Sequence, residues 1–193
     1  MRWYALFVQA GHEESLCKVL RKKLNHESTK FIVPKRKIPE RRNGDQVDVL
    51  RPLFPGYILV QAHMNTKIYY IFKDTPKVIR MLNHGYLHNS IAKKRSNVKC
   101  ENLDYNEYYF RDIPSTEIRR ILTLLDENDT INYSKVSIID SNITVKSGPL
   151  LHMETQIKKI DKRKGRAKIA LDFLGETKVV DIGVEVLKDG NNE

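Results

Sequence analysis

The chain has 193 residues, of which 40% are hydrophobic and 30% are charged. This composition is typical of a folded globular protein and excludes an intrinsically disordered chain. No apolar run reaches bilayer length, and the two cysteines form neither a zinc site nor a disulfide framework, so we expect a reduced cytoplasmic protein that does not contact a membrane.

The formal net charge of +10 is distributed unevenly along the chain. Residues 1–112 contain 21 Lys and Arg against 11 Asp and Glu, whereas residues 113–140 contain 3 against 5 and residues 141–193 contain 10 against 8. The excess therefore lies in the N-terminal part. Because surplus cations attract polyanions such as nucleic acid or acidic lipid, a one-sided excess predicts a binding face there, whereas a uniform excess would indicate only solubility.

Strand and helix patterns alternate over the first 82 residues. Leucines recur every four positions in residues 13–24, which predicts a helix with Cys17 on its buried face. Asn43-Gly44 is the strongest hairpin-turn signal in the chain. This order predicts an α+β sandwich in which helices pack on an antiparallel sheet. The other expected elements are strands at 3–8, 31–33, 57–61 and 77–82 and a helix at 65–73.

The C-terminal part has a different texture. Residues 83–112 are polar and show no period, so we treat them as an insertion in the first domain. Ser115 is expected to cap a helix that continues to Leu125. The polar, turn-rich residues 127–140 are expected to be a linker. Five short β-patterns in residues 141–193 (ITVK, QIKKID, AKIALDF, TKVVDI and VEVL) then predict a small all-β barrel.

The stretch RPLFPGYILVQ, residues 51–61, joins two patterns that fit together badly. Its second half is an ordinary buried strand. Its first half places Leu53, Phe54 and Tyr57 around two prolines and a glycine, where a soluble protein normally has a polar turn. We expect this corner (residues 52–57) to be exposed.

Four segments in the same order resemble the NusG family of transcription elongation factors. They are WYALFVQAGHEE, PLFPGYILVQ, TPKVIRML and the C-terminal ITVKSGPLL with KKIDKRKGRAKIALDFLGETKVVDI. The resemblance covers nearly the whole chain except residues 83–112. It implies an α+β N-terminal NusG domain at 1–126, a linker at 127–140 and an SH3-like KOW barrel at 141–193. Within the family, the very basic region 34–42 and the divergent C-terminal domain resemble specialised paralogs of the LoaP type, which act in processive antitermination.

The resemblance gives the apolar corner a role. In NusG-like proteins this region docks on the β′ clamp helices of RNA polymerase, which keeps the polymerase closed and less prone to pause or terminate. Rigid aromatic groups suit such an interface because they lose little conformational entropy on binding. The residues that the resemblance places at this interface are Trp3, Leu53, Phe54 and Tyr57.

An enzyme is not expected. The six histidines have no metal-ligand spacing, and the chain has no phosphate-binding glycine loop, nucleophile elbow or paired-cysteine motif. The resemblance likewise implies a monomeric factor that performs no chemistry and needs no cofactor.

A basic hairpin next to the corner is the leading candidate for nucleic-acid binding, although a solvated charge run is the alternative. Nascent RNA, as a hairpin, is the preferred ligand and the non-template DNA strand is the second. The hairpin candidates are Lys35, Arg36, Lys37, Arg41 and Arg42, with Arg51 beside them. A second candidate group, in the insertion, consists of Lys93, Lys94 and Arg95.

The C-terminal domain carries its own candidate contacts. The resemblance implies a contact with ribosomal protein S10 near Phe173 and Leu174, and Arg163 and Lys164 form a basic turn that is either a partner contact or solvated. Two other functions stay open: a general NusG-like elongation factor that acts on all genes, and a ribosome-associated KOW protein that binds RNA. The second is disfavoured because KOW-type ribosomal proteins do not need the FPGY domain.

Overall fold

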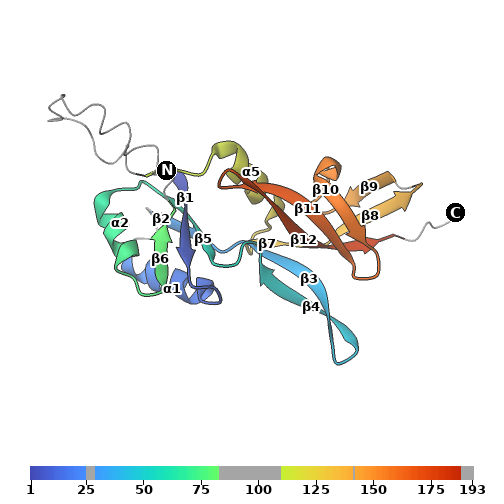
Figure 1. Ribbon diagram of the computed structural model, residues 1–193, viewed down its shortest axis with the longest axis horizontal. Helices are drawn as coiled ribbons and strands as arrows, with labels where there is room; N and C mark the ends of the chain where they lie inside the picture. The colour runs from blue at the N-terminus through green and yellow to red at the C-terminus, as the bar shows by residue number, and fades with distance from the viewer. Residues whose placement is uncertain (25–28, 83–109, 141, 188–193) are drawn as a thin grey trace. The chain divides into compact units, whose positions relative to one another are not determined.

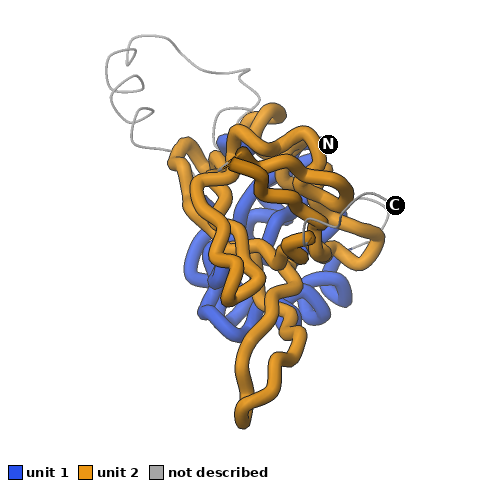
Figure 2. Tube along the Cα trace, turned by 90° about the vertical axis from the view of Figure 1, so that its right-hand side faces the viewer, with its two compact units in different colours: residues 1–33, 55–113 blue, residues 34–54, 114–193 orange. Residues whose placement is uncertain are grey.

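The computed structural model describes residues 1–24, 29–82, 110–140 and 142–187. By compactness the chain divides into two units (Figure 2). Unit 1 consists of residues 1–33 and 55–113, and unit 2 consists of residues 34–54 and 114–193. The basic hairpin thus belongs to the same unit as the C-terminal strands, although it lies in the N-terminal half of the sequence.

Unit 1 is a four-stranded antiparallel sheet with two helices (Figure 1). The strand order is β2-β5-β1-β6. Apolar residues of the sheet and of both helices join in one core, so the predicted sheet with flanking helices is confirmed, and Cys17 is buried in it. The elements are β1 (Arg2–Val8), α1 (Glu13–Lys23), β2 (Thr29–Ile32), β5 (Tyr57–Ala62), α2 (Thr66–Lys73) and β6 (Val78–Met81).

Unit 2 begins with the hairpin formed by β3 (Lys35–Arg42) and β4 (Asp45–Pro52). Both turn residues, Asn43 and Gly44, have positive φ, at 52° and 93°, which confirms the predicted tight hairpin turn. The short strand β7 (Thr130–Ile131) pairs parallel with the start of β3 and completes a three-stranded sheet.

The helix α5 (Ser115–Leu124) buries Ile118, Ile121 and Leu124, as its period predicts. Its start differs from the prediction. Ser115 is the first helical residue and Pro114 occupies the cap position, so no side chain caps the helix. The fixed φ of proline, −51° here, holds the chain as it enters the helix instead.

The C-terminal strands form a curled five-stranded sheet in the order β10-β11-β12-β8-β9, which confirms a small barrel. The residues that form these strands differ from two expectations. The expected linker contains β7 and β8, and the patterns TKVVDI and VEVL form one continuous strand, β12, despite the glycine at 183. The elements are β8 (Ser134–Ile139), β9 (Asn142–Ser147), the short 3-10 helix η2 (Glu154–Gln156), β10 (Ile157–Asp161), β11 (Arg166–Phe173) and β12 (Glu176–Val186).

A glycine is needed at position 183, within β12, because the backbone of β3 passes very close to it. A Cβ at this position would lie 2.5 Å from the carbonyl oxygen of Lys37 in β3 and 2.8 Å from the ring of Tyr133. Glycine therefore marks a close backbone approach here and not a strand end. This approach packs the base of the β3–β4 hairpin against the C-terminal sheet.

Candidate functional site

The sequence predicted an exposed apolar corner, but two of its large apolar residues are buried. Leu53 is 1% exposed and Phe54 is 4% exposed. The ring of Phe54 stacks on that of Phe173, with centroids 4.1 Å apart and planes 3° from parallel. An apolar ring without a partner protein is more stable covered than in water, and the end of β11 provides the cover.

Trp3 and Tyr57, the other two predicted docking residues, lie in unit 1 and are half-buried. Tyr57 faces Phe7 across the β1–β5 pair, with ring centroids 5.4 Å apart. The carbonyl of Trp3 accepts a hydrogen bond of 2.7 Å from the backbone of Ile113. Both aromatic side chains are therefore held on regular strands and partly accessible.

Two residues fix the backbone at the corner. Gly56 has a φ of +82°, and a Cβ there would lie 3.2 Å from the carbonyl oxygen of Val8, so glycine suits the position on both counts. The Gly56 amide donates a 2.7 Å hydrogen bond to Oε1 of Glu13, a carboxylate that is only 4% exposed. No local pattern in the sequence indicated this contact, because the two residues lie on segments that are far apart in the chain.

The base of the β3–β4 hairpin uses its cations inside the protein. Arg36 donates a 2.7 Å hydrogen bond from Nη1 to the carbonyl oxygen of Asp181 in β12, and burial lowers the pKa of this guanidinium. Among the described residues, the buried Nε of Arg36 has no partner. Lys37 forms an ion pair of 3.1 Å with Asp48 and lies 5.9 Å from the centroid of the Tyr133 ring. Of these two residues, both predicted to bind nucleic acid, Arg36 thus bonds the hairpin to β12, and Lys37 pairs with a carboxylate of the hairpin itself.

Tyr133 anchors the other strand of the hairpin. Its hydroxyl donates a 2.6 Å hydrogen bond to Oδ1 of Asp48 in β4. This bond, followed by the Lys37 ammonium, lowers the pKa of Asp48. Burial, then the hydrogen bond and charge of Asp48, raise the pKa of Tyr133. Sequence reasoning missed this contact because it placed Tyr133 in a linker.

Further along the hairpin, the cations divide into neutralised and accessible groups. Arg51 donates two hydrogen bonds to Glu40, of 2.9 and 2.8 Å, and Arg42 lies 3.9 Å from the same carboxylate. The hydrogen bond from Arg51 is the main reason that the pKa of Glu40 is lowered. Arg41 is exposed, and no described residue pairs with it. Lys35 is half-buried, and its amide bonds to the carbonyl oxygen of Asp129 at 2.8 Å.

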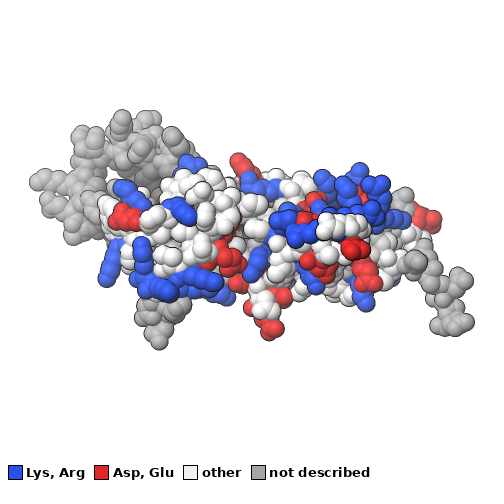
Figure 3. Space-filling view, turned by 90° about the horizontal axis from the view of Figure 1, so that it is seen from below, with Lys and Arg blue, Asp and Glu red and all other residues white. Residues whose placement is uncertain are grey.

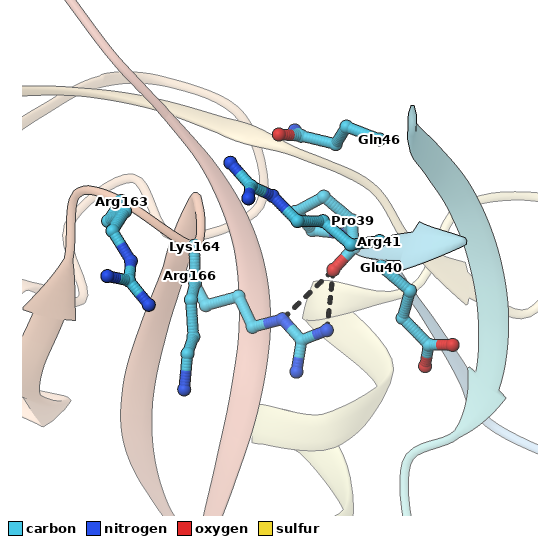
Figure 4. Close-up of a pocket in the computed structure, with 7 residues that line it drawn as sticks. All are labelled: Pro39, Glu40, Arg41, Gln46, Arg163, Lys164 and Arg166. Carbon is cyan, nitrogen blue, oxygen red and sulfur yellow. Dashed lines mark hydrogen bonds between the residues drawn. The ribbon is translucent and has the colours of Figure 1, made fainter. Parts of the chain in front are cut away.

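A pocket of about 330 Å³ opens where the hairpin meets the turn between β10 and β11 (Figure 4). Arg41 and the basic turn, which the sequence assigned to separate sites, lie on the same pocket. Arg166 crosses it and donates from Nε and Nη2 to the carbonyl oxygen of Pro39, the first at 3.1 Å. The lining residues are Pro39, Glu40, Arg41, Gln46, Arg163, Lys164 and Arg166.

The remaining candidates fare differently. Lys93, Lys94 and Arg95 lie outside the described residues. Phe173 is fully buried, so the expected contact of a partner with this ring cannot form in this conformation. Leu174 is half-buried with a φ of +59°, while Arg163 and Lys164 are exposed.

The surface charge is distributed in groups. In Figure 3, the Lys and Arg of the described residues gather in several clusters, with Asp and Glu among them. Within the described ranges, no group of three His, Cys, Asp or Glu could hold a metal ion. No helix in those ranges is long and apolar enough to cross a membrane.

Comparison with known proteins gives a consistent result. The family described as "Transcription termination factor nusG" matches residues 1–98. A Pseudomonas aeruginosa protein named transcription termination/antitermination protein NusG is 25% identical over 186 residues, which cover 94% of each chain. The protein of that name from Staphylococcus carnosus is 21% identical over 186 residues, which cover 94% of this chain and 91% of that one. A solved structure described as domain interaction in Thermotoga maritima NusG has a TM-score of 0.55 at 20% identity, covering 94% of this chain and 93% of that one, which shows the fold.

Proposed function

This chain belongs to the NusG family, and from that premise we propose that it is a transcription factor that binds RNA polymerase and suppresses pausing and termination. The family match over residues 1–98 carries this proposal, because it includes β1 and β5 and the corner between β4 and β5. The role needs binding surfaces and no catalytic residue, so the factor would act by holding the polymerase in its elongating form.

The docking surface that we propose is the corner with its neighbouring strand, which meets the β′ clamp helices of the polymerase. Trp3 and Tyr57 are accessible enough to make first contact. Leu53 and Phe54 are buried, so their participation requires Phe54 to separate from Phe173. Docking would cover Phe54 again with an apolar surface of the partner, which lowers the net cost of opening.

Polymerase binding by purified variants tests this surface. We expect Tyr57→Ala and Trp3→Ala each to weaken polymerase binding about thirtyfold, which is the loss expected of an aromatic residue at the centre of an interface. The matched control is Tyr70→Ala, because Tyr70 is an aromatic residue that is 49% exposed and belongs to α2, which is not part of the proposed docking surface. Phe54→Ala is a poor test, since removing a buried ring costs about 3–5 kcal/mol of stability by itself. Normal capture by both the Tyr57 and Trp3 variants would refute the docking assignment.

We further propose that the factor acts at selected long operons and finds them through nascent RNA, as a hairpin, with the non-template DNA strand as the second choice of ligand. The supporting observation is the exposed cationic group on the hairpin and the β10–β11 turn. A general elongation factor is the second candidate, because the relatives from Pseudomonas aeruginosa and Staphylococcus carnosus are both named as termination/antitermination proteins without a restricted target.

Crosslinking in cells followed by sequencing of the bound RNA separates these two candidates. Signal at a few leader regions would support the operon-specific factor, and signal along most transcripts would support the general one. Transcription with purified polymerase on a template with one terminator adds a direct readout. Increased read-through is expected for either candidate, and unchanged read-through together with no polymerase capture would refute the proposed function.

A C-terminal contact with ribosomal protein S10 also remains a proposal. Leu174, Arg163 and Lys164 are accessible for such a contact, whereas Phe173 is not. If Phe54 leaves Phe173 when the polymerase binds, the ring becomes available. Capture of purified S10 in the presence and absence of polymerase tests this order of events.

A further inference from the structure

The β3–β4 hairpin and the β10–β11 turn meet through contacts that leave little freedom. Gly165, in the turn, has a φ of +61°, and a Cβ there would lie 3.3 Å from Cγ of Pro39. Its carbonyl accepts a 2.9 Å hydrogen bond from the Val184 amide in β12. Arg166 adds its two hydrogen bonds to the Pro39 carbonyl. The walls of the pocket between these segments are therefore defined by backbone contacts and not by mobile side chains alone.

The cations in this pocket have different freedom to bind a ligand. The Arg166 guanidinium is already engaged by Pro39, and its Nη1 lies 3.8 Å from Asp181, so it holds the pocket together. Lys164 lies 4.0 Å from Asp161. Arg41 and Arg163 are exposed and have no ion pair or hydrogen bond with the part of the chain that the structure describes. These two guanidinium groups are the ones available to an incoming anion.

The only carboxylate on the pocket lining is already neutralised. Glu40 accepts both hydrogen bonds of the Arg51 fork and also lies 3.9 Å from Arg42. Because these cations lower the pKa of Glu40, it stays ionised and paired at neutral pH. Lys164 and Arg166 each lie near an aspartate outside the lining, so the cationic surplus of the lining comes from Arg41 and Arg163, and Gln46 supplies a neutral amide beside them.

We propose that Arg41 and Arg163 together hold a backbone phosphate of a nucleic-acid strand in this pocket, an inference that rests on the proposed function. Two guanidinium forks suit the tetrahedral oxygens of a phosphodiester, and arginine binds such groups through paired hydrogen bonds. Figure 4 shows Arg41 reaching from β3 toward the turn that carries Arg163. A volume of about 330 Å³ admits the phosphate and part of its sugar.

This arrangement also explains why the two basic segments are needed together. The hairpin alone presents Arg41 without a second fork, and the turn alone presents Arg163 without a wall behind the ligand. A nucleic-acid strand that contacts both elements would bridge the hairpin and the barrel of unit 2. Binding would therefore hold the nucleic acid and also stabilise the packing of the hairpin against the barrel.

The test uses the full chain and a short fluorescein-labelled single-stranded RNA, with affinity measured by anisotropy over a series of salt concentrations. We expect Arg41→Ala and Arg163→Ala each to weaken binding about tenfold, the loss expected of a charge-assisted hydrogen-bond pair. The double variant should lose less than the product of the two, because both forks hold one phosphate. Its log–log salt slope should fall by roughly 0.7, the value for one phosphate on a single strand.

The matched control is Arg119→Ala, which removes the same charge from an exposed position on α5 in the same unit. A loss equal to that of the control in both pocket variants, with normal wild-type affinity, would overturn the pocket and leave the proposed function standing. No binding of RNA by the wild-type chain would overturn both the pocket and the nucleic-acid part of the proposed function. Multiplicative losses in the double variant would overturn the shared phosphate.

A second arm separates a backbone phosphate from free phosphate as the natural ligand. Inorganic phosphate is titrated against wild type and the double variant while the melting temperature is recorded. Stabilisation of the wild type alone, with RNA affinity equal in the two chains, would assign the pocket to a small anion and overturn the nucleic-acid assignment. Loss of RNA affinity in the double variant, with no difference in the phosphate titration at millimolar concentration, supports it.

Discussion

The base and the tip of the β3–β4 hairpin come from one run of cationic residues, KRKIPERR, yet the structure uses them differently. At the base, Arg36 and Lys37 bond to groups of the same unit, Asp181 and Asp48. Towards the tip, Arg41 is exposed beside a pocket. Arginine and lysine therefore stabilise the fold where a carbonyl or carboxylate of the chain lies within reach, and they stay available to a ligand where none does.

The largest expected effect breaks the base of the hairpin. Gly183→Ala places a Cβ 2.5 Å from the Lys37 carbonyl, a backbone atom that cannot move aside easily. We expect a loss of about 3 kcal/mol in the free energy of unfolding, measured by chemical denaturation. Gly175→Ala is the control without a clash, because nothing lies within 4 Å of the new Cβ. Its φ of +79° adds a backbone strain that Gly183, whose φ is not in this region, does not have, so the control loss sets an upper limit for a glycine-to-alanine change without a close contact. Equal losses in the two variants would contradict the close approach of β3 to β12.

The next effect separates base from tip directly. Arg36→Met keeps the apolar stem but removes the hydrogen bond to the Asp181 carbonyl, so it should cost about 2 kcal/mol of stability. Arg41→Ala should change stability by less than about 0.5 kcal/mol, because it removes only an exposed group. Denaturation and RNA affinity are measured on both variants. A larger loss of stability for Arg41→Ala than for Arg36→Met would contradict these assignments.

A smaller effect appears as a pH dependence at the base. The pKa of Asp48 is lowered in the folded state by Tyr133 and Lys37. The stability that ionised Asp48 adds to the folded state is therefore fully present above the ordinary Asp pKa of about 4. It is lost as the pH falls through the lowered pKa. The melting temperature of wild type minus that of Asp48→Asn should be constant from neutral pH to about pH 5 and shrink below about pH 4. A difference that persists in strong acid would contradict the assignment.

The smallest expected effect is a change in RNA affinity caused by a substitution near the tip of the hairpin. Glu40→Gln removes the carboxylate that occupies Arg51 and part of Arg42. Both cations then become available to a nucleic acid, so RNA affinity should rise about twofold, with a steeper salt dependence. Anisotropy titration against wild type measures this change. Weaker binding would mean that Glu40 positions Arg51 for the ligand instead of competing with it.

Local signals predicted most of the elements. The turn at Asn43-Gly44 was predictable because it needs only its own two residues to adopt positive φ. The strand β8 was missed because the polar residues before it read as a linker, although its partner β12 fixes it as a strand. A strand whose pairing partner is distant carries little mark of that pairing in its own sequence.

The candidate site was less predictable than the fold because it depends on contacts between distant segments. Glu13 and Gly56 are 43 residues apart, and no period connects them. The cover over Phe54 likewise comes from Phe173, which the sequence assigned to another partner. Residue types were a good guide to candidates, whereas their burial and partners required the three-dimensional arrangement.

The stack of Phe54 on Phe173 has a thermodynamic consequence if both rings serve the partners proposed for them. A polymerase that takes Phe54 leaves Phe173 uncovered, and a ribosomal protein that takes Phe173 leaves Phe54 uncovered. Each partner then pays the opening cost for the other, so by reciprocity each must raise the affinity of the chain for the other by the same factor. One pair of rings would in this way make the chain a cooperative coupler between transcription and translation.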